Sequence, residues 1–363
     1  METTMIREYS KSELSRLLQE PGFWQLDNLP FTKLRLAQYL ANPIAEDDDI
    51  LWLMAFINER IVGYLGVIPD RIKIDDQVDK FGWPTSWWID PEHRGSGLAD
   101  RLMQRLAELY PRMAANSGTP RALDKLQQSG LMQIYGKRPR TWYFLNLNAS
   151  VLHDFKRDGK LVMAILPVLR LIGSTISKFR LKKWLATSAA PVLKVDFLDK
   201  PDIGALVTLK DLWQNDFTYK DATSFVWQNS NPAFAPRLKG VESLKLTYFG
   251  NNGYHNMSFQ LMLYHNDKPT GWMSLVLSDG VLKLPFVYLK PGYERGWLDL
   301  LAKICLSNGV DVIYSQSSSL LEQMDKHGFP CLFRKSYKMK LLISKSLAAL
   351  PKGRILQDGD GAF

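Results

Sequence analysis

Residues 89–99, with the sequence IDPEHRGSGLA, place one arginine and two closely spaced glycines directly before an apolar helical pattern. The N-terminus of a helix exposes backbone N–H groups without partners and carries a partial positive charge. Gly95 and Gly97 would let the backbone approach an anion closely, and Arg94 would add a full positive charge. The spacing predicts an anion-binding turn that suits a diphosphate. A simple turn into a helix, without a ligand, is the alternative.

This turn differs from two familiar nucleotide loops. One has the pattern GxGxxG with a later acidic residue, and the other has the pattern GxxxxGK[ST]. Gly95-Ser96-Gly97 matches neither of them. The residues alone therefore predict an anion site without identifying the anion.

Strand and helix patterns surround the turn. Residues 51–67 are typical of two apolar strands joined by a polar turn, and residues 71–90 contain further strand segments. Apolar residues at helical spacing predict a helix from 98 to 110, followed by a short strand at 113–115 and a helix at 120–130. Residues 131–136 and 140–147 predict a closing hairpin around Lys137-Arg138-Pro139. This order favours a mixed sheet with helices packed on it.

The segment Arg94-Gly-Ser-Gly97-Leu-Ala99 resembles motif A of the GNAT superfamily of N-acetyltransferases, whose pattern is R/Q-x-x-G-x-G/A. The resemblance covers about residues 1–150. A hairpin and a strand precede the motif, an amphipathic helix follows it, and DKLQQSGL lies where the family has its YEKLGF-like helix end. The resemblance implies a mixed sheet in which two splayed central strands hold the pantetheine arm of acetyl-CoA or another acyl-CoA.

The same resemblance implies which residues bind the cofactor. Backbone N–H groups between His93 and Leu98 would bind the diphosphate, and the backbones of Trp88 and Ile89 would bind the pantetheine. The implied cofactor-binding residues are Trp88, Ile89, His93, Arg94, Gly95, Ser96, Gly97, Leu98 and Ala99.

The second half of the chain repeats the first in outline. Four matches occur in the same order: 58–64 with 266–272, 42–43 with 231–232, Pro91 with Pro291, and 126–131 with 324–329. The stretch 289–297, LKPGYERGW, lacks the double-glycine opening, and Trp297 would crowd an anion. We therefore expect an α/β (α+β) protein with two GNAT-like mixed-sheet domains, at 1–150 and 195–363. A helical connector at 151–194 would join them, and the second domain would be degenerate, leaving one cofactor site per chain.

The catalytic residues are less evident than the cofactor loop. Many members of the family have a tyrosine as proton donor where this chain has Leu126, and Met324 takes that place in the second half. Tyr135 could supply the proton, although a strand aromatic packed on the sheet explains it as well. Asn116 could contact the thioester or the pantetheine, or could be a turn residue. Phe23-Trp24 could line an acceptor pocket, with core packing as the favoured alternative.

Composition limits the remaining possibilities. The excess of 46 Lys and Arg over 37 Asp and Glu gives a net charge of +9, which attracts polyanions, but no nucleic-acid-binding signature is present. The two cysteines and dispersed histidines indicate neither a disulfide framework nor a metal site. No signal peptide is visible, so we expect a cytoplasmic protein. Residues 161–185 are apolar and basic, which fits contact with a membrane surface but better fits packing between domains.

The sequence thus predicts an N-acyltransferase that uses an acyl-CoA and a small amine, with an amino sugar of a surface polysaccharide as the candidate acceptor. A non-catalytic acyl-CoA-binding or scaffold protein is the alternative, motivated by Leu126. A peripheral membrane or nucleic-acid-associated protein is the third hypothesis.

Overall fold

Short turns of polar residues set the register of the long strands in both halves. Asn58 and Glu59 have φ values of 47° and 65°, and Asn266 and Asp267 have values of 49° and 57°. Left-handed conformation at both positions of a two-residue turn matches the twist of antiparallel strands. Each half therefore contains the hairpin that the sequence predicts.

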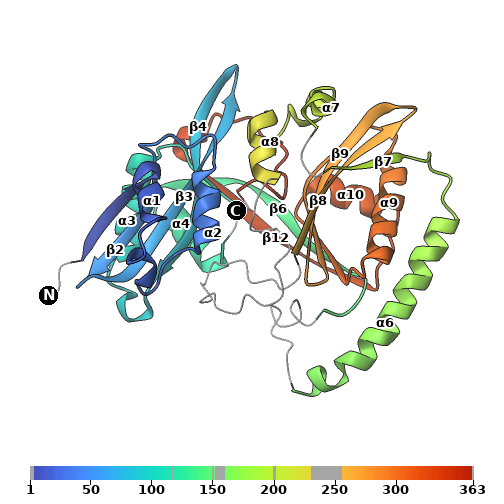
Figure 1. Ribbon diagram of the computed structural model, residues 1–363, viewed down its shortest axis with the longest axis horizontal. Coiled ribbons are helices and arrows are strands. Elements are labelled where there is room, and N and C mark those ends of the chain that lie inside the picture. The colour runs from blue at the N-terminus through green and yellow to red at the C-terminus, as the bar shows by residue number, and fades with distance from the viewer. Residues whose placement is uncertain are drawn as a thin grey trace.

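A computed structural model describes residues 4–116, 118–148, 151, 160–198, 202–229 and 256–361 (Figure 1). The match between 42–43 and 231–232 involves residues 231 and 232, which lie outside this set. The elements of the first half are β1 (Met5–Ser10), α1 (Lys11–Leu17), η1 (Phe23–Gln25), α2 (Lys33–Leu40), β2 (Ile50–Ile57), β3 (Arg60–Ile74), β4 (Gln77–Ile89), η2 (Pro91–His93), α3 (Leu98–Leu109), β5 (Ala114–Ala115), α4 (Pro120–Gln128) and β6 (Met132–Phe144).

The helix α6 (Lys160–Ala186) leads into the second half. That half contains β7 (Lys194–Leu198), α7 (Ile203–Val207), η3 (Lys210–Trp213), α8 (Ala222–Asn229), β8 (Asn256–His265), β9 (Lys268–Ser278), β10 (Val281–Leu289), α9 (Glu294–Ser307), β11 (Val312–Ser315), α10 (Ser318–Lys326), β12 (Phe333–Ser344) and η5 (Lys345–Leu347). The order β2-β3-β4-α3-β5-α4-β6 of the first half recurs as β8-β9-β10-α9-β11-α10-β12.

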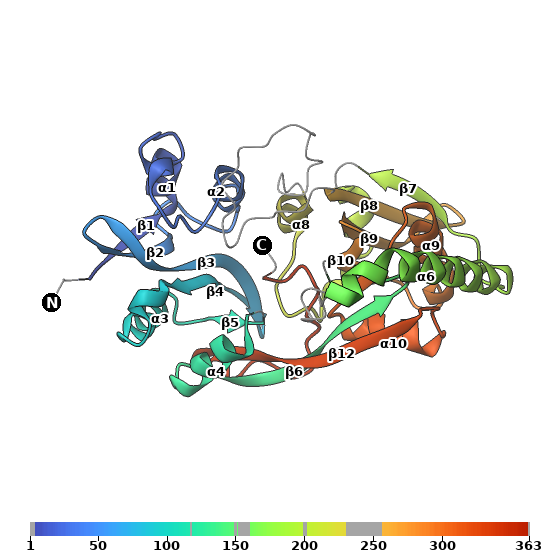
Figure 2. The same cartoon turned by 90° about the horizontal axis from the view of Figure 1, so that it is seen from below.

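The two halves exchange their last strands. One sheet has the order β1-β2-β3-β4, and the other has the order β5-β12-β6-β11-β10-β9-β8-β7. β12 from the second half therefore lies between β5 and β6, while β6 from the first half lies between β12 and β11. Figure 2 shows these two strands running together through both parts of the molecule. The eight-stranded sheet is thus shared by the two halves.

The closing hairpin expected around Lys137-Arg138-Pro139 is wrong. These residues lie inside the continuous strand β6, which pairs with β12 along its whole length. β11 pairs only with residues 141–144 of β6, so one edge of β6 is open at Pro139. Because proline lacks an N–H group, such an open edge tolerates it.

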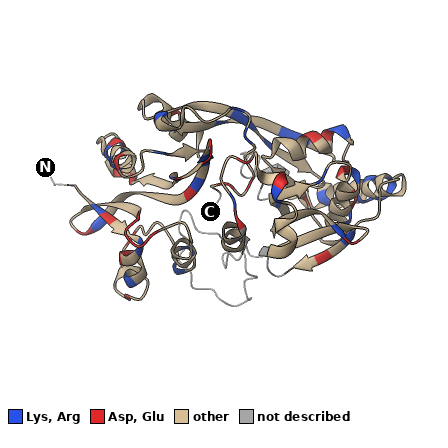
Figure 3. Cartoon of the chain, turned by 90° about the horizontal axis from the view of Figure 1, so that it is seen from above, with Lys and Arg blue, Asp and Glu red and all other residues tan. Residues whose placement is uncertain are grey.

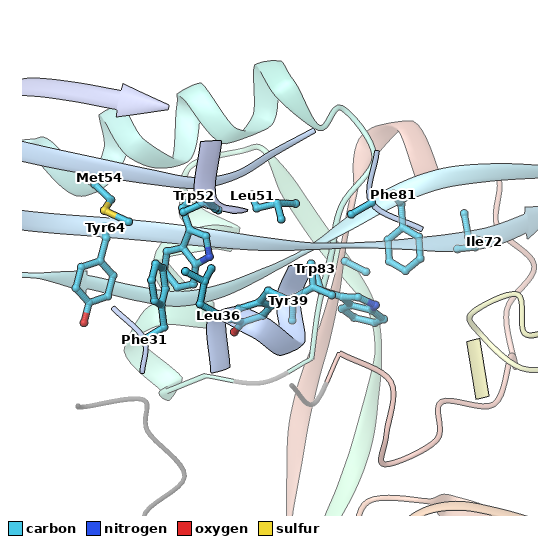
Figure 4. Packing of buried hydrophobic residues seen from close by; sticks show 14 of the residues in the cluster. Phe31, Leu36, Tyr39, Leu51, Trp52, Met54, Tyr64, Ile72, Phe81 and Trp83 are labelled. Carbon is cyan, nitrogen blue, oxygen red and sulfur yellow. The ribbon is translucent and has the colours of Figure 1, made fainter. Parts of the chain in front are cut away.

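The core of the first half has two clusters, one against α3 and α4 and the other on the opposite face of the β1–β4 sheet. Figure 4 shows Phe31, Leu36 and Tyr39 packed against Trp52 from β2. Phe23 is buried in this cluster, which accords with core packing rather than an open acceptor pocket. The second half also contributes: Trp227 of α8 joins the cluster, and its Nε1 donates to the backbone oxygen of Gln38 at 3.1 Å.

Of the connector expected at 151–194, residues 160–186 form one long helix, α6, while residues 152–159 lie outside the described set. α6 continues through Pro167, the eighth residue of this 27-residue helix, and packs against α9 of the second half. Leu181 belongs to the core of that half, and Ser177 donates its hydroxyl to the backbone oxygen of Leu145. No helix among the described residues is both long and apolar enough to cross a bilayer.

Candidate functional site

The turn before α3 presents open backbone amides at the start of a helix. Gly95 and Gly97 have φ values of 87° and 78°, a conformation that favours glycine, and space is open where their side chains would be. Gly97 is the N-cap of α3, and no side chain of the described residues caps this end of the helix. The amides of Gly95, Gly97 and Ala99 have no hydrogen-bond partner among the described residues. An anion could accept from all three.

Asp90 fixes the entry to this turn. Its Oδ1 accepts from the backbone N–H of Glu92 at 3.0 Å, and its Oδ2 lies 3.0 Å from Nη2 of Arg60. Asp90 is therefore a buried cap of η2, and both of its carboxylate oxygens already have partners.

The strands β4 and β5 meet only at one point among the described residues. Gly82 and Met113 form an isolated parallel bridge, and Gly82 donates its N–H to the backbone oxygen of Arg112 at 3.0 Å. Further along β4, Ser86 has a φ of 52° and lies in a bulge against β3. A bulge bends a strand and disrupts its regular pairing. The open edge of β4 beyond Gly82 therefore leads to Trp88, Ile89 and the turn.

A pocket of about 550 Å³ lies over the turn. It contains every cofactor-binding residue expected from the sequence except Ser96, whose hydroxyl instead donates to the backbone oxygen of His93 at 2.7 Å. Its sequence-predicted lining residues are Trp88, Ile89, His93, Arg94, Gly95, Gly97, Leu98 and Ala99. The structure thus brings the predicted set together around one opening.

The opposite wall of the pocket was missed from the sequence. It comes from the start of α4, with Thr119, Arg121, Ala122 and Lys125. Trp87 on β4 and Asp100 on α3 also line the pocket and were not expected. The sequence did contain a signal for this wall: a predicted strand at 113–115 is followed by a helix that starts at Pro120. This order places the start of α4 at the same sheet edge as the start of α3. Arg94, Arg121 and Lys125 give the pocket three cations against the one carboxylate of Asp100, from which Lys125 lies 2.7 Å away. This balance suits a polyanion.

The basic residues of the whole chain are not gathered at this pocket. Figure 3 shows lysines and arginines over both halves, interspersed with acidic residues. The attraction of the pocket for an anion therefore depends on its own amides and its three cations, rather than on a large one-sign surface.

A second pocket, of about 700 Å³, continues from the first along α3. The two share Trp87, Asp100 and Lys125. Glu8 and Glu108 line the second pocket and form ion pairs with Arg105, so the positive charge of Arg105 is neutralised. Since carboxylates disfavour a diphosphate, the pocket over the turn is the better anion site.

Neither predicted catalytic residue lines the pocket over the turn. Asn116 is buried at the end of β5 and donates its side-chain amide to the backbone oxygen of Asp360 at 2.7 Å. Tyr135 lies on β6, packs edge-on against Phe217 and donates its hydroxyl to the backbone oxygen of Pro351. Leu126 is buried in the core against α3, so it takes no part in proton transfer.

The C-terminal segment 356–361 connects the openings of the two halves. Gly359 donates its N–H to the backbone oxygen of Pro285 on β10 at 2.8 Å, and Asp358 accepts from the N–H of Gln316, which follows β11, at 2.7 Å. At its other end, the segment accepts the bond from Asn116 and packs Gly361 against Trp83. It therefore fills the space between β10 and β11, where the second half would have its own cofactor opening.

The equivalent turn of the second half is closed by its own carboxylate. Gly292 has a φ of 93°, but its N–H donates to Oε2 of Glu294 at 2.9 Å. Trp297 is buried in the core, with its Nε1 3.3 Å from the sulfur of Met273. The expectation that Trp297 crowds an anion is wrong, because its ring faces the core. Glu294 is the group that occupies the turn.

A buried carboxyl lies on β3 near the end of the C-terminal segment. Asp70 accepts hydrogen bonds from Nε1 of Trp83 at 3.0 Å and from the N–H of Arg71 at 2.8 Å. Burial is the main cause that raises the pKa of Asp70 to about 7, against the hydrogen bond from Arg71 and with repulsion from Asp360. Its charge is therefore costly to the folded state.

Replacing Asp70 by asparagine should change how stability depends on pH. The pKa of Asp70 is raised on folding from its ordinary value of 3.8 to about 7, so the folded state holds the proton more tightly. The resulting stabilisation is present below the lower value and is lost as the pH rises through the upper one. From pH 5 to pH 8, the free energy of unfolding of Asp70→Asn should rise by roughly 2–3 kcal/mol relative to that of the wild type.

Chemical denaturation at the two pH values measures this difference. The control is Asp76→Asn, whose side chain is fully exposed, and it should show no such change. An equal gap between Asp70→Asn and the wild type at both pH values would show that Asp70 is ionised throughout.

Residues 13–122 match the model of the acetyltransferase (GNAT) family. Among curated proteins, none matches the chain.

Solved structures share the fold over nearly the whole chain. A GCN5-related N-acetyltransferase from Anabaena variabilis is 13% identical, with a TM-score of 0.51 over 94% of this chain and 72% of that one. A second protein of that description, from Kribbella flavida, is 10% identical, with a TM-score of 0.51 over 94% and 71%. Saccharomyces cerevisiae N-myristoyltransferase with bound myristoyl-CoA is 12% identical, with a TM-score of 0.52 over 95% and 83%.

Proposed function

Since residues 13–122 match the model of the acetyltransferase (GNAT) family, we propose that the protein is an acyl-CoA-dependent N-acyltransferase. The observation that carries the proposal is the set of three open amides, of Gly95, Gly97 and Ala99, at the start of α3. These amides face a pocket with three cations, which suits the diphosphate of coenzyme A.

The proposal assigns one cofactor site to each chain. In the first half, the turn is open and β4 and β5 part beyond Gly82. In the second half, Glu294 bonds to the amide of Gly292, and the C-terminal segment bonds to residues on β10 and after β11. In the second half, the protein itself thus occupies both the turn that would bind the diphosphate and the space between β10 and β11.

The proposed reaction is the transfer of an acyl group to a small amine. The amine nitrogen attacks the thioester carbonyl, the carbon–sulfur bond breaks, and the proton lost by the nitrogen goes to solvent or to the leaving thiolate. In this proposal, Asn116 positions the C-terminal segment through its bond to Asp360, next to the point where β4 and β5 part. Tyr135 remains a predicted proton donor. We propose an amino sugar of a surface polysaccharide as the acceptor. The proposed location of the protein is the cytoplasm.

The test measures free coenzyme A released from acetyl-CoA and from longer acyl-CoA thioesters, with and without a panel of amines that includes amino sugars. Release that depends on one amine, with the acylated amine identified by mass spectrometry, is the expected result. Tyr135→Phe in the same assay tests its role in proton transfer, because this change keeps the ring contact with Phe217 and removes only the hydroxyl.

Leu126 is buried and takes the place of the usual proton donor, which supports one alternative function, that of a non-catalytic protein. A non-catalytic acyl-CoA-binding protein would bind coenzyme A in calorimetry but release none from the thioester with any amine in the panel. Calorimetry and the release assay together therefore separate the two functions.

A further inference from the structure

The outward face of α6 is apolar although it faces solvent. Figures 1 and 2 show α6 along the outer edge of the second half. Val168, Leu171 and Phe179 are 61%, 71% and 68% exposed. Ile165, Ile172 and Ile176 are also exposed. An exposed apolar patch of this kind, on one element, is typical of a surface that docks on something.

The exposed and buried residues of α6 lie on different sides of the helix. At 100° per residue, Val168, Ile172 and Phe179 fall within about 40° of one another around the axis. Leu166, Gly173 and Leu181 are buried and fall on the opposite side, against the second half. The apolar face is therefore additional to the face that packs on the protein, and packing among the described residues does not account for it.

The charge of α6 has one sign. Residues 160–186 contain Lys160, Arg170, Lys178, Arg180, Lys182 and Lys183 but no aspartate or glutamate. Two of the arginines hold the helix to the body: Arg170 lies 2.9 Å from Asp311, and Arg180 donates to the backbone oxygen of Cys331 at 2.9 Å. Lys178, Lys182 and Lys183 are exposed, and no carboxylate of the described residues pairs with them.

We propose that α6 docks the protein on an anionic lipid surface, with its apolar face in the boundary between headgroups and acyl chains. A helix with an apolar face and neighbouring lysines has the chemistry of a helix that lies in the membrane surface. A second copy of the chain suits this face less well, because pairing two such helices would bring lysines of like charge together. The proposal does not depend on acyl transfer.

The test is co-sedimentation of the full chain with vesicles of phosphatidylcholine, with or without phosphatidylglycerol. The bound fraction should be at least about tenfold higher with phosphatidylglycerol and should fall at high salt. Val168→Glu with Phe179→Glu should reduce binding by about tenfold or more, because it places charge on the inserted face. Lys178→Glu with Lys182→Glu should remove the preference for phosphatidylglycerol.

The matched control is Leu34→Glu with Val78→Glu, two residues of the first half that are each 42% exposed. It should bind vesicles like the wild type. Thermal unfolding and binding of coenzyme A should be unchanged in all variants, which separates a failure of docking from a failure of folding.

Three outcomes would overturn the proposal. The first is no binding of the wild type to phosphatidylglycerol vesicles at low salt. The second is equal binding by the α6 variants. The third is a dimer in analytical ultracentrifugation that the α6 changes abolish, without binding to vesicles, since this would assign the face to a second copy of the chain.

Discussion

Gly97→Trp should lower the affinity for coenzyme A by about 100-fold or more, because losing two charge-assisted hydrogen bonds at about 1.5 kcal/mol each has an effect of that size. Gly97 lies between the open amides of Gly95 and Ala99, and its φ of 78° directs any side chain into open space beside them. An indole there would stand where the diphosphate must approach. Isothermal titration calorimetry with coenzyme A measures the loss.

The control for this change lies in the second half. Gly292 has a φ of 93° and open space at its Cβ position, so Gly292→Trp imposes the same kind of backbone strain, about 1–2 kcal/mol. Because Glu294 already occupies that turn, Gly292→Trp should leave the affinity for coenzyme A unchanged. A similar loss in both variants would attribute the effect to strain, and unchanged affinity in Gly97→Trp would contradict the assigned site.

The turn at residues 94–99 could be predicted from the sequence because its signal is local. An arginine, two glycines and a helix start lie within a few residues, and the positive φ values of Gly95 and Gly97 follow from the same requirement. The hairpin turns at Asn58 and Asn266 were predictable for the same reason. The conformation of each of these turns is determined by residues within the turn or directly beside it.

The remaining features depend on contacts between distant residues. β12 pairs with both β5 and β6, and no local pattern distinguishes this exchange from a hairpin within each half. The role of Glu294 was hidden because a carboxylate near a turn is also a common solvent-exposed residue. The bond from Asn116 to Asp360 spans most of the chain, so the spacing of either residue says nothing about the other.

The largest loss of stability should follow from Lys220→Met. Nζ of Lys220 lies 2.8 Å from Asp216 and 2.9 Å from Asp360, and all three side chains are buried. Burial opposes the charge of Lys220, but the two carboxylates outweigh it and raise the pKa of the ammonium group. Removing the ammonium leaves two buried carboxylates facing each other, which should cost about 3–5 kcal/mol in free energy of unfolding.

Chemical denaturation of Lys220→Met measures this cost, with Lys210→Met at an exposed position of η3 as the control. The control should change stability by less than about 0.5 kcal/mol. Adding Asp216→Asn and Asp360→Asn to Lys220→Met should recover most of the loss, because no buried charge then remains unpaired. A small loss in Lys220→Met alone would mean that the two carboxylates take up protons without cost.

The same variant connects stability to the proposed site. Asp360 accepts from Thr218 and from Lys220 through its side chain, and its backbone oxygen accepts from Asn116 at the end of β5. Lys220 therefore holds the C-terminal segment against the point where β4 and β5 part, although it does not line the pocket over the turn. Without denaturant, at a temperature where Lys220→Met stays folded, acyl transfer should fall. The affinity for coenzyme A should change little, because the amides of Gly95 and Gly97 do not depend on this segment.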